Sequence, residues 1–121
     1  MTKALVIEDN PDNMLLIVEL LKAAGFSVQK TITGLDGFEM ARTQKPDLIL
    51  HDIQLPDIDG FEVLKRLREH KESKDIPVVA LTAFAMSGDK DKLMASGCAG
   101  YIEKPIDPSR VIDQIVESLG K

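Results

Sequence analysis

Chemically active residues follow several of the short apolar runs in this chain. Glu8 and Asp9 come after the first run, Asp52 comes after the third, Thr82 ends the fourth, and Lys104 follows the fifth. Short apolar runs bounded by turn residues are typical of strands buried on both faces of a parallel sheet. The carboxyl ends of such strands meet at one edge of the sheet, where ligands bind. We therefore expect these side chains to form one site.

The three acids of this set favour a bound cation. Two carboxylates about 4 Å apart repel each other by roughly 4 kcal/mol at an effective dielectric constant near 20. Lys104 can neutralise only part of that negative charge. Carboxylate oxygens suit a hard divalent cation, and Mg²⁺ is the best match.

A carboxylate beside Mg²⁺ and an ammonium group can attack phosphorus, because both cations neutralise the phosphoryl oxygens. We therefore predict that Asp52 is a nucleophile that forms an aspartyl phosphate, with Lys104 beside it. Thr82 can donate a hydrogen bond to a phosphoryl oxygen. Each of these residues alone also has an ordinary structural role, such as capping a turn or lying in solvent. Only their joint placement makes them site residues.

The apolar pattern also predicts the elements that would place these residues. Short apolar runs predict strands at 3–7, 26–30, 48–51, 77–82 and 99–102, and helical periodicity predicts helices that begin at 11, 34, 60, 90 and 107. Asn10 and Pro11 suit the start of the first helix, and Gly25 suits its end. The alternation predicts an α/β fold: a parallel sheet with right-handed crossovers and helices on both faces. The polar strand at 26–30 should lie at an edge.

Two segments look less firmly packed than the rest. The helix predicted at 90–96 has few apolar residues, so we expect it to be weakly held and easy to shift. The dense mixed-charge run at 65–75 is interpreted as a solvated helix end and the loop that follows it.

Length and composition limit the possible functions. The 121 residues suit one domain that spans 1–121, and the net charge of −5 argues against nucleic acid or an anionic membrane as a partner. One cysteine cannot form an internal disulfide, and the sequence has no signal peptide or long apolar span. We expect a cytoplasmic protein.

Several short motifs, in this order and spacing, are together highly specific. They are Val6-Ile-Glu-Asp-Asn10, Asp47-Leu-Ile-Leu-His-Asp-Ile-Gln-Leu-Pro56 with Gly60, Leu81-Thr-Ala83, Gly97-Cys98 and Tyr101-Ile-Glu-Lys-Pro105. With them the chain resembles, over essentially its whole length, a response-regulator receiver domain of two-component signalling. The segment 84–89 further resembles single-domain regulators of the division-control type and the receivers of hybrid kinases.

This resemblance implies a fold and a set of roles. The fold would be flavodoxin-like, with strand order 2-1-3-4-5 and five helices. Asp52 would accept a phosphoryl group from the phosphohistidine of a histidine kinase or a histidine phosphotransfer protein. Mg²⁺ would be bound by Asp9, Asp52 and the backbone carbonyl of Gln54, with Glu8 acting through water. Thr82 and Lys104 would hold the phosphoryl group, and the Lys104–Pro105 peptide bond would be cis.

The resemblance also implies how the signal leaves the domain. Thr82 and Tyr101 would move together on phosphorylation and change the face formed by the helix at 90–96, the strand at 99–102 and the last helix. We expect a downstream protein to contact Phe84, Met86, Met94 and Tyr101 on that face. The protein would be a monomer or a weak dimer, and the only reactions it would catalyse are its own phosphorylation and dephosphorylation.

Two other functions stay open at this point. One is a phosphatase that forms an aspartyl phosphate, although such enzymes carry an Asp-x-Asp motif after the first strand, and this chain has Glu8-Asp9-Asn10 there. The other is an adaptor that keeps the fold but is never phosphorylated; the complete set of two acids, hydroxyl and lysine argues against it.

His51 departs from the family pattern, which usually has an apolar residue before the acceptor. Because side chains alternate along a strand, His51 should point away from Asp52 and toward a helix. We therefore expect a packed, neutral histidine rather than a participant in phosphotransfer. If the ring is partly buried, its titration would make stability depend on pH.

Overall fold

A computed structural model of the chain describes residues 2–53, 57–82 and 87–119, and the side chains of residues 87–90 are not considered below. Strands and helices alternate along it. The strands are β1 (Lys3–Ile7), β2 (Ser27–Thr31), β3 (Leu48–Asp52), β4 (Val78–Thr82) and β5 (Gly100–Glu103). The helices are α1 (Pro11–Ala23), α2 (Gly34–Gln44), α3 (Gly60–Glu69), α4 (Ser87–Ala95) and α5 (Val111–Ser118).

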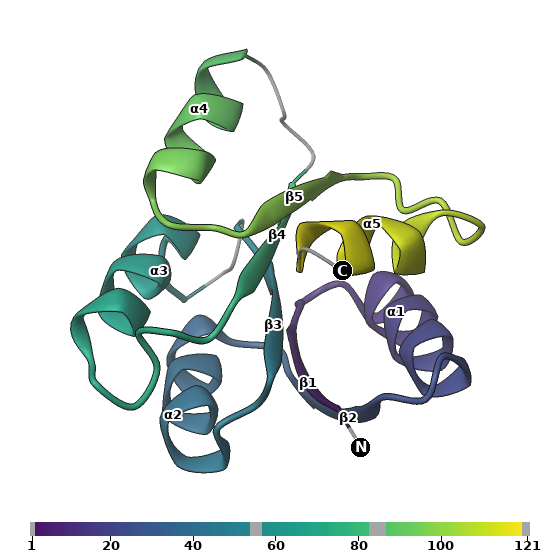
Figure 1. The fold of residues 1–121 in the computed structure, drawn as a ribbon, viewed down its shortest axis with the longest axis horizontal. Helices are drawn as coiled ribbons and strands as arrows, with labels where there is room; N and C mark the ends of the chain where they lie inside the picture. Colours follow the sequence, from purple (N-terminus) through teal and green to yellow (C-terminus); the bar gives the residue numbers. More distant parts are fainter. Residues whose placement is uncertain (1, 54–56, 83–86, 120–121) are drawn as a thin grey trace.

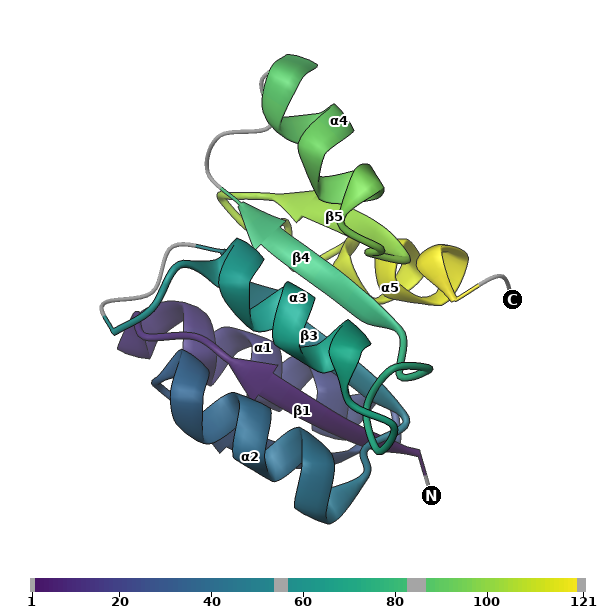
Figure 2. The same ribbon diagram turned by 90° about the vertical axis from the view of Figure 1, so that its left-hand side faces the viewer.

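The strands form one parallel sheet in the order β2-β1-β3-β4-β5. Helices α1 and α5 cover one face, and α2, α3 and α4 lie on the other (Figure 1). Figure 2 looks onto the face that carries α2, α3 and α4. The predicted fold class, strand order and edge position of β2 are confirmed.

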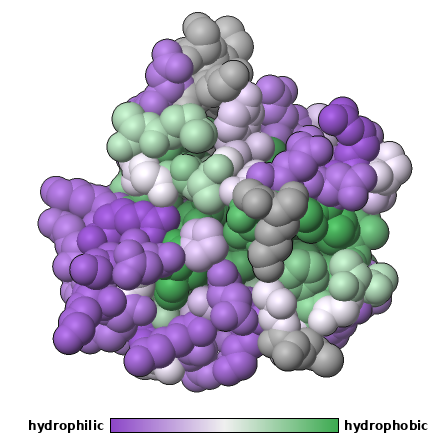
Figure 3. Space-filling model, viewed as in Figure 1, coloured by the Kyte–Doolittle hydropathy of each residue, from purple (hydrophilic) through white to green (hydrophobic). Residues whose placement is uncertain are grey.

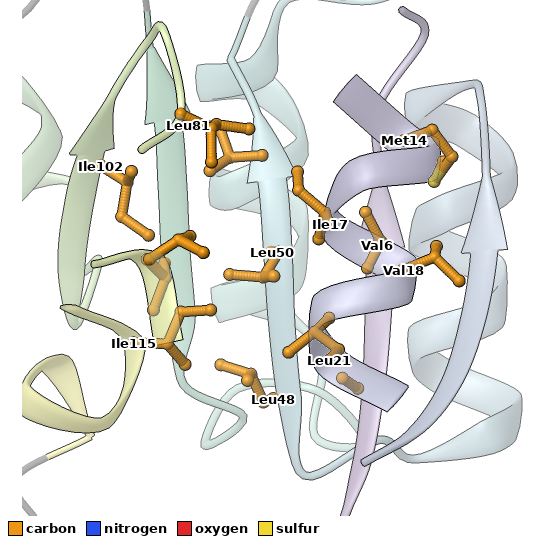
Figure 4. Packing of buried hydrophobic residues seen from close by; sticks show 14 residues of the cluster. Val6, Met14, Ile17, Val18, Leu21, Leu48, Leu50, Leu81, Ile102 and Ile115 are labelled. Atoms are coloured by element: carbon orange, nitrogen blue, oxygen red, sulfur yellow. The ribbon is translucent and has the colours of Figure 1, made fainter. Parts of the chain in front are cut away.

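Two hydrophobic clusters, one on each side of the sheet, hold β3 in place. Leu48 and Leu50 pack with α1 and α5 (Figure 4), whereas Ile49 packs with α2 and α3 on the other side. Every residue of β3 is buried. The strand that ends in Asp52 is therefore fixed from both faces, as the apolar run predicted.

The ends of α1 follow from local sequence. The side chain of Asn10 accepts a hydrogen bond from the backbone amide of Asn13 at 3.0 Å, and Pro11 occupies the first helical position. Gly25 follows the helix with φ +96°, a conformation that favours glycine. These three predictions are confirmed, and β1 therefore leads into its helix directly after Glu8 and Asp9.

Each strand after β1 differs from its predicted range by one residue at one or both ends, and the starts of α4 and α5 differ by more. Strand β2 begins at Ser27 rather than at residue 26, and α4 begins at Ser87 rather than at residue 90. Small and acidic residues suit a first helical turn, so residues 87–89 can belong to α4 although the apolar pattern of the sequence does not extend to them.

Helix α5 begins at Val111, not at Asp107. The side chain of Asp107 accepts hydrogen bonds from the amide and the hydroxyl of Ser109, at 3.0 and 2.7 Å. These bonds close a separate turn that comes before the helix.

The charged run at 65–75 is only partly solvated. The surface over α3 and the loop that follows it is hydrophilic (Figure 3), as expected from its composition. However, Ser73 is buried, and its hydroxyl donates to the carbonyl of Leu67 at 2.7 Å. Arg68 donates to three backbone carbonyls: those of Lys74 and Ile76 at 2.8 Å and that of Gly97 at 2.9 Å.

Within the described ranges, no helix combines the length and the apolar character that crossing a bilayer requires.

Candidate functional site

The fold brings the chemically active residues to the carboxyl edge of the sheet. β1, β3 and β4 are adjacent and parallel, so Glu8, Asp52 and Thr82 leave three neighbouring strands at the same edge. All three side chains are buried, with exposed fractions of 0% for Glu8, 2% for Asp52 and 4% for Thr82. Asp9 is exposed beside them.

Lys104 joins two of the acids. Its Nζ lies 2.8 Å from Oε1 of Glu8 and 3.0 Å from Oδ2 of Asp52. Its backbone amide donates to the carbonyl of Thr82 at 2.8 Å, and the Lys104–Pro105 peptide bond is cis. The segment after β5 is thus tied to the end of β4, and the ammonium group reaches back over the sheet edge.

The pKa values of this group reflect its burial. Burial, helped by a hydrogen bond with Asp52, raises the pKa of Glu8 to about 7, and the nearby ammonium group only partly opposes this. Burial alone would lower the pKa of Lys104, but its hydrogen bonds to Glu8 and Asp52 outweigh burial and raise it. The single ammonium group of Lys104 is therefore not enough to keep both buried acids fully ionised near pH 7.

The acids are close enough to share a cation. One carboxylate oxygen from each of Glu8, Asp9 and Asp52 lies within 4.8 Å of the others. Oxygen donors of this kind fit a hard divalent ion such as Mg²⁺, whose charge would add to that of the Lys104 ammonium group beside Glu8 and Asp52. The residues present therefore fit the expected ion.

Several residues expected at the site lie outside the described ranges. These are Gln54, whose backbone carbonyl is a predicted metal ligand, and Phe84 and Met86, predicted to contact a partner. Tyr101 is partly buried and packs against the cluster formed with α2, α3 and α4.

The predicted partner face includes a shallow hollow between α4, β5 and α5. It has a volume of about 410 Å³, and its lining includes Met94, Tyr101, Arg110 and Gln114. Met94, in the last turn of α4, is 47% exposed.

His51 points away from Asp52, as strand alternation predicted. It is completely buried, and its Nε2 lies 3.2 Å from the carbonyl oxygen of Gly60 at the start of α3. Burial lowers the pKa of His51 to about 4, so the ring is neutral near pH 7 and Nε2 donates the hydrogen bond. The prediction of a packed, neutral histidine is confirmed.

The loop between β3 and α3 contains a contact that the sequence did not predict. The carboxylate of Asp57 accepts hydrogen bonds from the backbone amides of Gly34 at 2.9 Å and Leu35 at 3.0 Å, at the start of α2. Slight desolvation acts against them, but these bonds lower the pKa of Asp57. Because Gly34 and Asp57 are 23 residues apart in the sequence, no local sequence pattern predicts this hydrogen bond.

Comparison with known proteins gives consistent matches over nearly the whole chain. A family model described as the response regulator receiver domain matches residues 4–116. The polar-differentiation response regulator DivK of Brucella ovis is 46% identical over 121 residues, which cover 99% of this chain and 98% of that protein. DivK of Brucella anthropi is 46% identical over 116 residues, which cover 96% of this chain and 94% of that protein.

Solved structures show the same architecture. The chemotaxis response regulator CheY4 of Vibrio cholerae matches with a TM-score of 0.92 and 25% identity, over 98% of each chain. The receiver domain of a sensor histidine kinase from Pseudomonas aeruginosa PAO1, solved with a magnesium ion coordinated in its active site cleft, matches with a TM-score of 0.88 and 29% identity. That match covers 99% of this chain and 98% of the other.

Proposed function

Because the chain belongs to the response regulator receiver domain family of two-component signalling, we propose that it is a cytoplasmic switch phosphorylated on Asp52. The phosphoryl donor would be a histidine kinase or a histidine phosphotransfer protein. The family does not indicate a catalytic enzyme, and the only chemistry proposed is the gain and loss of the domain's own phosphoryl group.

One observation carries this proposal: Lys104 Nζ contacts both Asp52 and Glu8 at the buried end of β3. A single ammonium group held beside a buried carboxylate is placed to neutralise an incoming phosphoryl group. A carboxylate that merely capped a turn would not need a lysine from a different strand end.

The reaction is a direct transfer to Asp52. A carboxylate oxygen of Asp52 forms a bond to phosphorus while the bond between phosphorus and the donor's histidine nitrogen breaks, and that nitrogen keeps the electron pair. Lys104 holds the phosphoryl oxygens by charge, and the hydroxyl of Thr82 donates a hydrogen bond to one of them.

Asp9, Asp52 and the backbone carbonyl of Gln54 would hold Mg²⁺, and Glu8 would act through water. When bound, the ion supplies positive charge that offsets the negative charge of the phosphoryl group. The close approach of the three carboxylates supports this assignment, as does the magnesium ion in the cleft of the kinase receiver.

The output would be a change of protein contacts. Thr82 and Tyr101 would shift when the phosphoryl group is present, and this would favour one of two pre-existing arrangements of the face formed by α4, β5 and α5. Met94 and Tyr101 line the hollow on that face, where a downstream protein would bind. We propose a monomer or a weak dimer, with no nucleic acid or membrane partner.

Phosphorylation can be tested directly. We expect acetyl phosphate or phosphoramidate with Mg²⁺ to add one phosphoryl group to the wild type, seen by intact-mass spectrometry, and none to Asp52→Asn. Absence of an adduct on the wild type would support an unphosphorylated adaptor instead. Steady turnover of small phosphate esters would support a phosphatase.

The output face is tested separately with Tyr101→Ala. We expect this variant to be phosphorylated like the wild type but to lose the dependence of partner binding on phosphorylation, measured by pull-down with and without phosphodonor. Asp52→Asn serves as the control that cannot be switched. Unchanged dependence in Tyr101→Ala would rule out this role of Tyr101.

A further inference from the structure

The start of α3 is tied to the end of β3, where Asp52 lies. The carbonyl of Gly60 lies 3.2 Å from Nε2 of His51, and the amide of Gly60 donates to the carbonyl of Ile53 at 3.0 Å. His51 and Ile53 are the two neighbours of Asp52 in the chain. A side chain at residue 60 would collide with the backbone of Ile53, so this close approach requires glycine. The first residue of α3 is therefore held on both sides of Asp52.

The next residue of α3, Phe61, connects this point to α4. Its ring packs against the hydrophobic cluster that contains Leu93 of α4. Nζ of Lys92, also on α4, lies 4.1 Å from the centre of the Phe61 ring. An ammonium group at this distance is attracted by the electron-rich face of the ring. The contact is a cation–π interaction between the start of α3 and the last turn of α4.

A second tie between the two helices lies near the other end of α3. There Arg68 donates to the carbonyl of Gly97, in the turn after α4, at 2.9 Å. Strand β4 is visible between α3 and α4 in Figure 2. Both ties border a hollow of about 430 Å³, which is lined by Phe61, Lys65, Arg68, Glu69 and Ser96. Because side chains do not fill this hollow, α4 can shift there without displacing a packed layer.

We propose that the contact between Phe61 and Lys92 is a latch that holds α4 in the arrangement described here and opposes phosphorylation of Asp52. This inference rests on the proposed function, in which the phosphoryl group favours a second arrangement of the face that includes α4. In the arrangement described here, Asp52 is a carboxylate paired with Lys104. A contact that stabilises this arrangement lowers the fraction of molecules in the one that phosphorylation favours.

Lys92→Gln tests the latch with little other change. Lys92 is exposed, and glutamine removes the charge while it keeps similar length and helix propensity. Lys92→Arg is the conservative variant, because a guanidinium group also binds an aromatic face. Lys65→Gln is the matched control, since Lys65 is an exposed lysine on α3 that lines the same hollow. Phe61→Leu removes the ring but keeps an apolar side chain.

Hydrogen exchange followed by mass spectrometry measures the latch itself. We expect exchange over 91–96 to be about two- to fivefold faster in Lys92→Gln, as the strength of an exposed cation–π contact implies. The double variant Phe61→Leu/Lys92→Gln should exchange no faster than Phe61→Leu, because the two side chains act through each other. Lys92→Arg and Lys65→Gln should exchange like the wild type. Unchanged exchange in Lys92→Gln would overturn the inference.

Phosphorylation by phosphoramidate in saturating Mg²⁺, followed by intact-mass spectrometry, measures the effect on the site. Lys92→Gln should react about two- to fivefold faster than the wild type, because more molecules occupy the reactive arrangement. Lys92→Arg and Lys65→Gln should react like the wild type. A rate in Lys92→Gln at or below that of the wild type, or an equal acceleration in Lys65→Gln, would overturn the inference. If Phe61→Leu does not fold, Lys92→Gln decides alone. A wild type that is never phosphorylated would instead overturn the proposed function.

Discussion

At the scale of single residues, the neighbouring side chains of His51 and Asp52 have different roles. Asp52 leaves the end of β3 toward Lys104, whereas the preceding His51 points to the start of α3. Nε2 of His51 donates to Gly60, and Nδ1 has no hydrogen-bond partner among the described residues. The charges of Asp52 and Asp57 favour protonation of the ring, but burial outweighs them. His51 thus links β3 to Gly60, the first residue of α3.

Protonation of His51 should destabilise the fold at low pH. Its pKa falls from 6.5 in the unfolded chain to about 4 in the fold, so the unfolded state binds more protons between these values. In EDTA, the titration of His51 should lower the free energy of unfolding by about 2 kcal/mol when the pH falls from roughly 7.5 to 5.

The comparison requires a His51→Leu variant, because the raised pKa of Glu8 makes protonation favour the fold over part of the same range. Urea unfolding of both proteins at the two pH values isolates the contribution of His51. An equal change in wild type and variant would show that the ring does not titrate as described.

At the scale of elements, the C-terminal end of α4 is tied to the rest of the fold. Among its described side chains, Leu93 is buried and Met94 is exposed. The turn after the helix contains Gly97 at φ +92°, and Arg68 donates to the carbonyl of that glycine. The predicted weak packing of α4 therefore has a fixed point at one end, and motion of the helix would pivot there.

Removing this fixed point should loosen α4 specifically. Arg68→Met loses three hydrogen bonds from a charged group and should cost about 2 kcal/mol of unfolding free energy. Hydrogen exchange followed by mass spectrometry should show faster exchange over 91–99 and no change in α1.

Arg66→Met is the matched control for this change. Arg66 lies on α3, like Arg68, and forms an exposed ion pair with Glu62 at 3.4 Å. Its replacement should therefore lower the free energy of unfolding by less than about 0.5 kcal/mol. Similar exchange over 91–99 in both variants would contradict the assigned role of Arg68.

At the scale of the whole molecule, the site at the sheet edge competes with stability. Two buried acids share one ammonium group, and burial together with the hydrogen bond to Asp52 raises the pKa of Glu8 despite the nearby lysine. Such local conflicts are expected where a fold is shaped for function.

Asp52→Asn should therefore stabilise the protein in the absence of Mg²⁺. At about pH 8 in EDTA, removing one of two like charges should raise the free energy of unfolding by about 1 kcal/mol. Adding Mg²⁺ should make the wild type the more stable of the two. At a hundredfold excess of Mg²⁺ over the dissociation constant, binding raises the free energy of unfolding of the wild type by roughly 2.7 kcal/mol and that of the variant by less. Urea unfolding followed by circular dichroism measures both effects. A less stable variant in EDTA would mean that the Asp52–Lys104 attraction outweighs the repulsion.

Much of this molecule could be predicted from its sequence. The sequence located all the strands to within one residue, and the apolar runs of β1, β3 and β4 were the clearest signal because strands buried on both faces have little freedom in composition. The expected site residues within the described ranges also meet at one edge, because the parallel topology dictates it. Helix starts were less accurate, as α4 and α5 show, because polar residues can begin a helix or form a separate turn.

The contacts of Asp57 and Arg68 could not be predicted in the same way. Both side chains bind backbone groups of segments that are distant in sequence, and backbone groups look alike at every position. An acid in a loop and an arginine in a charged run each have a plausible role in solvent, so only the folded chain reveals their partners.

The contact of Asp57 with the first two amides of α2 has a consequence for swapping parts between relatives. A junction placed between Gln44 and Leu48 takes the helix from one parent and Asp57 from the other. A hybrid whose second parent lacks an acceptor at position 57 would inherit an α2 with two unsatisfied amides, although each half is intact in its own source. Junctions after residue 57 keep the pair together, so rewired regulators of this kind are best assembled with α2 and the β3–α3 loop as one inherited block.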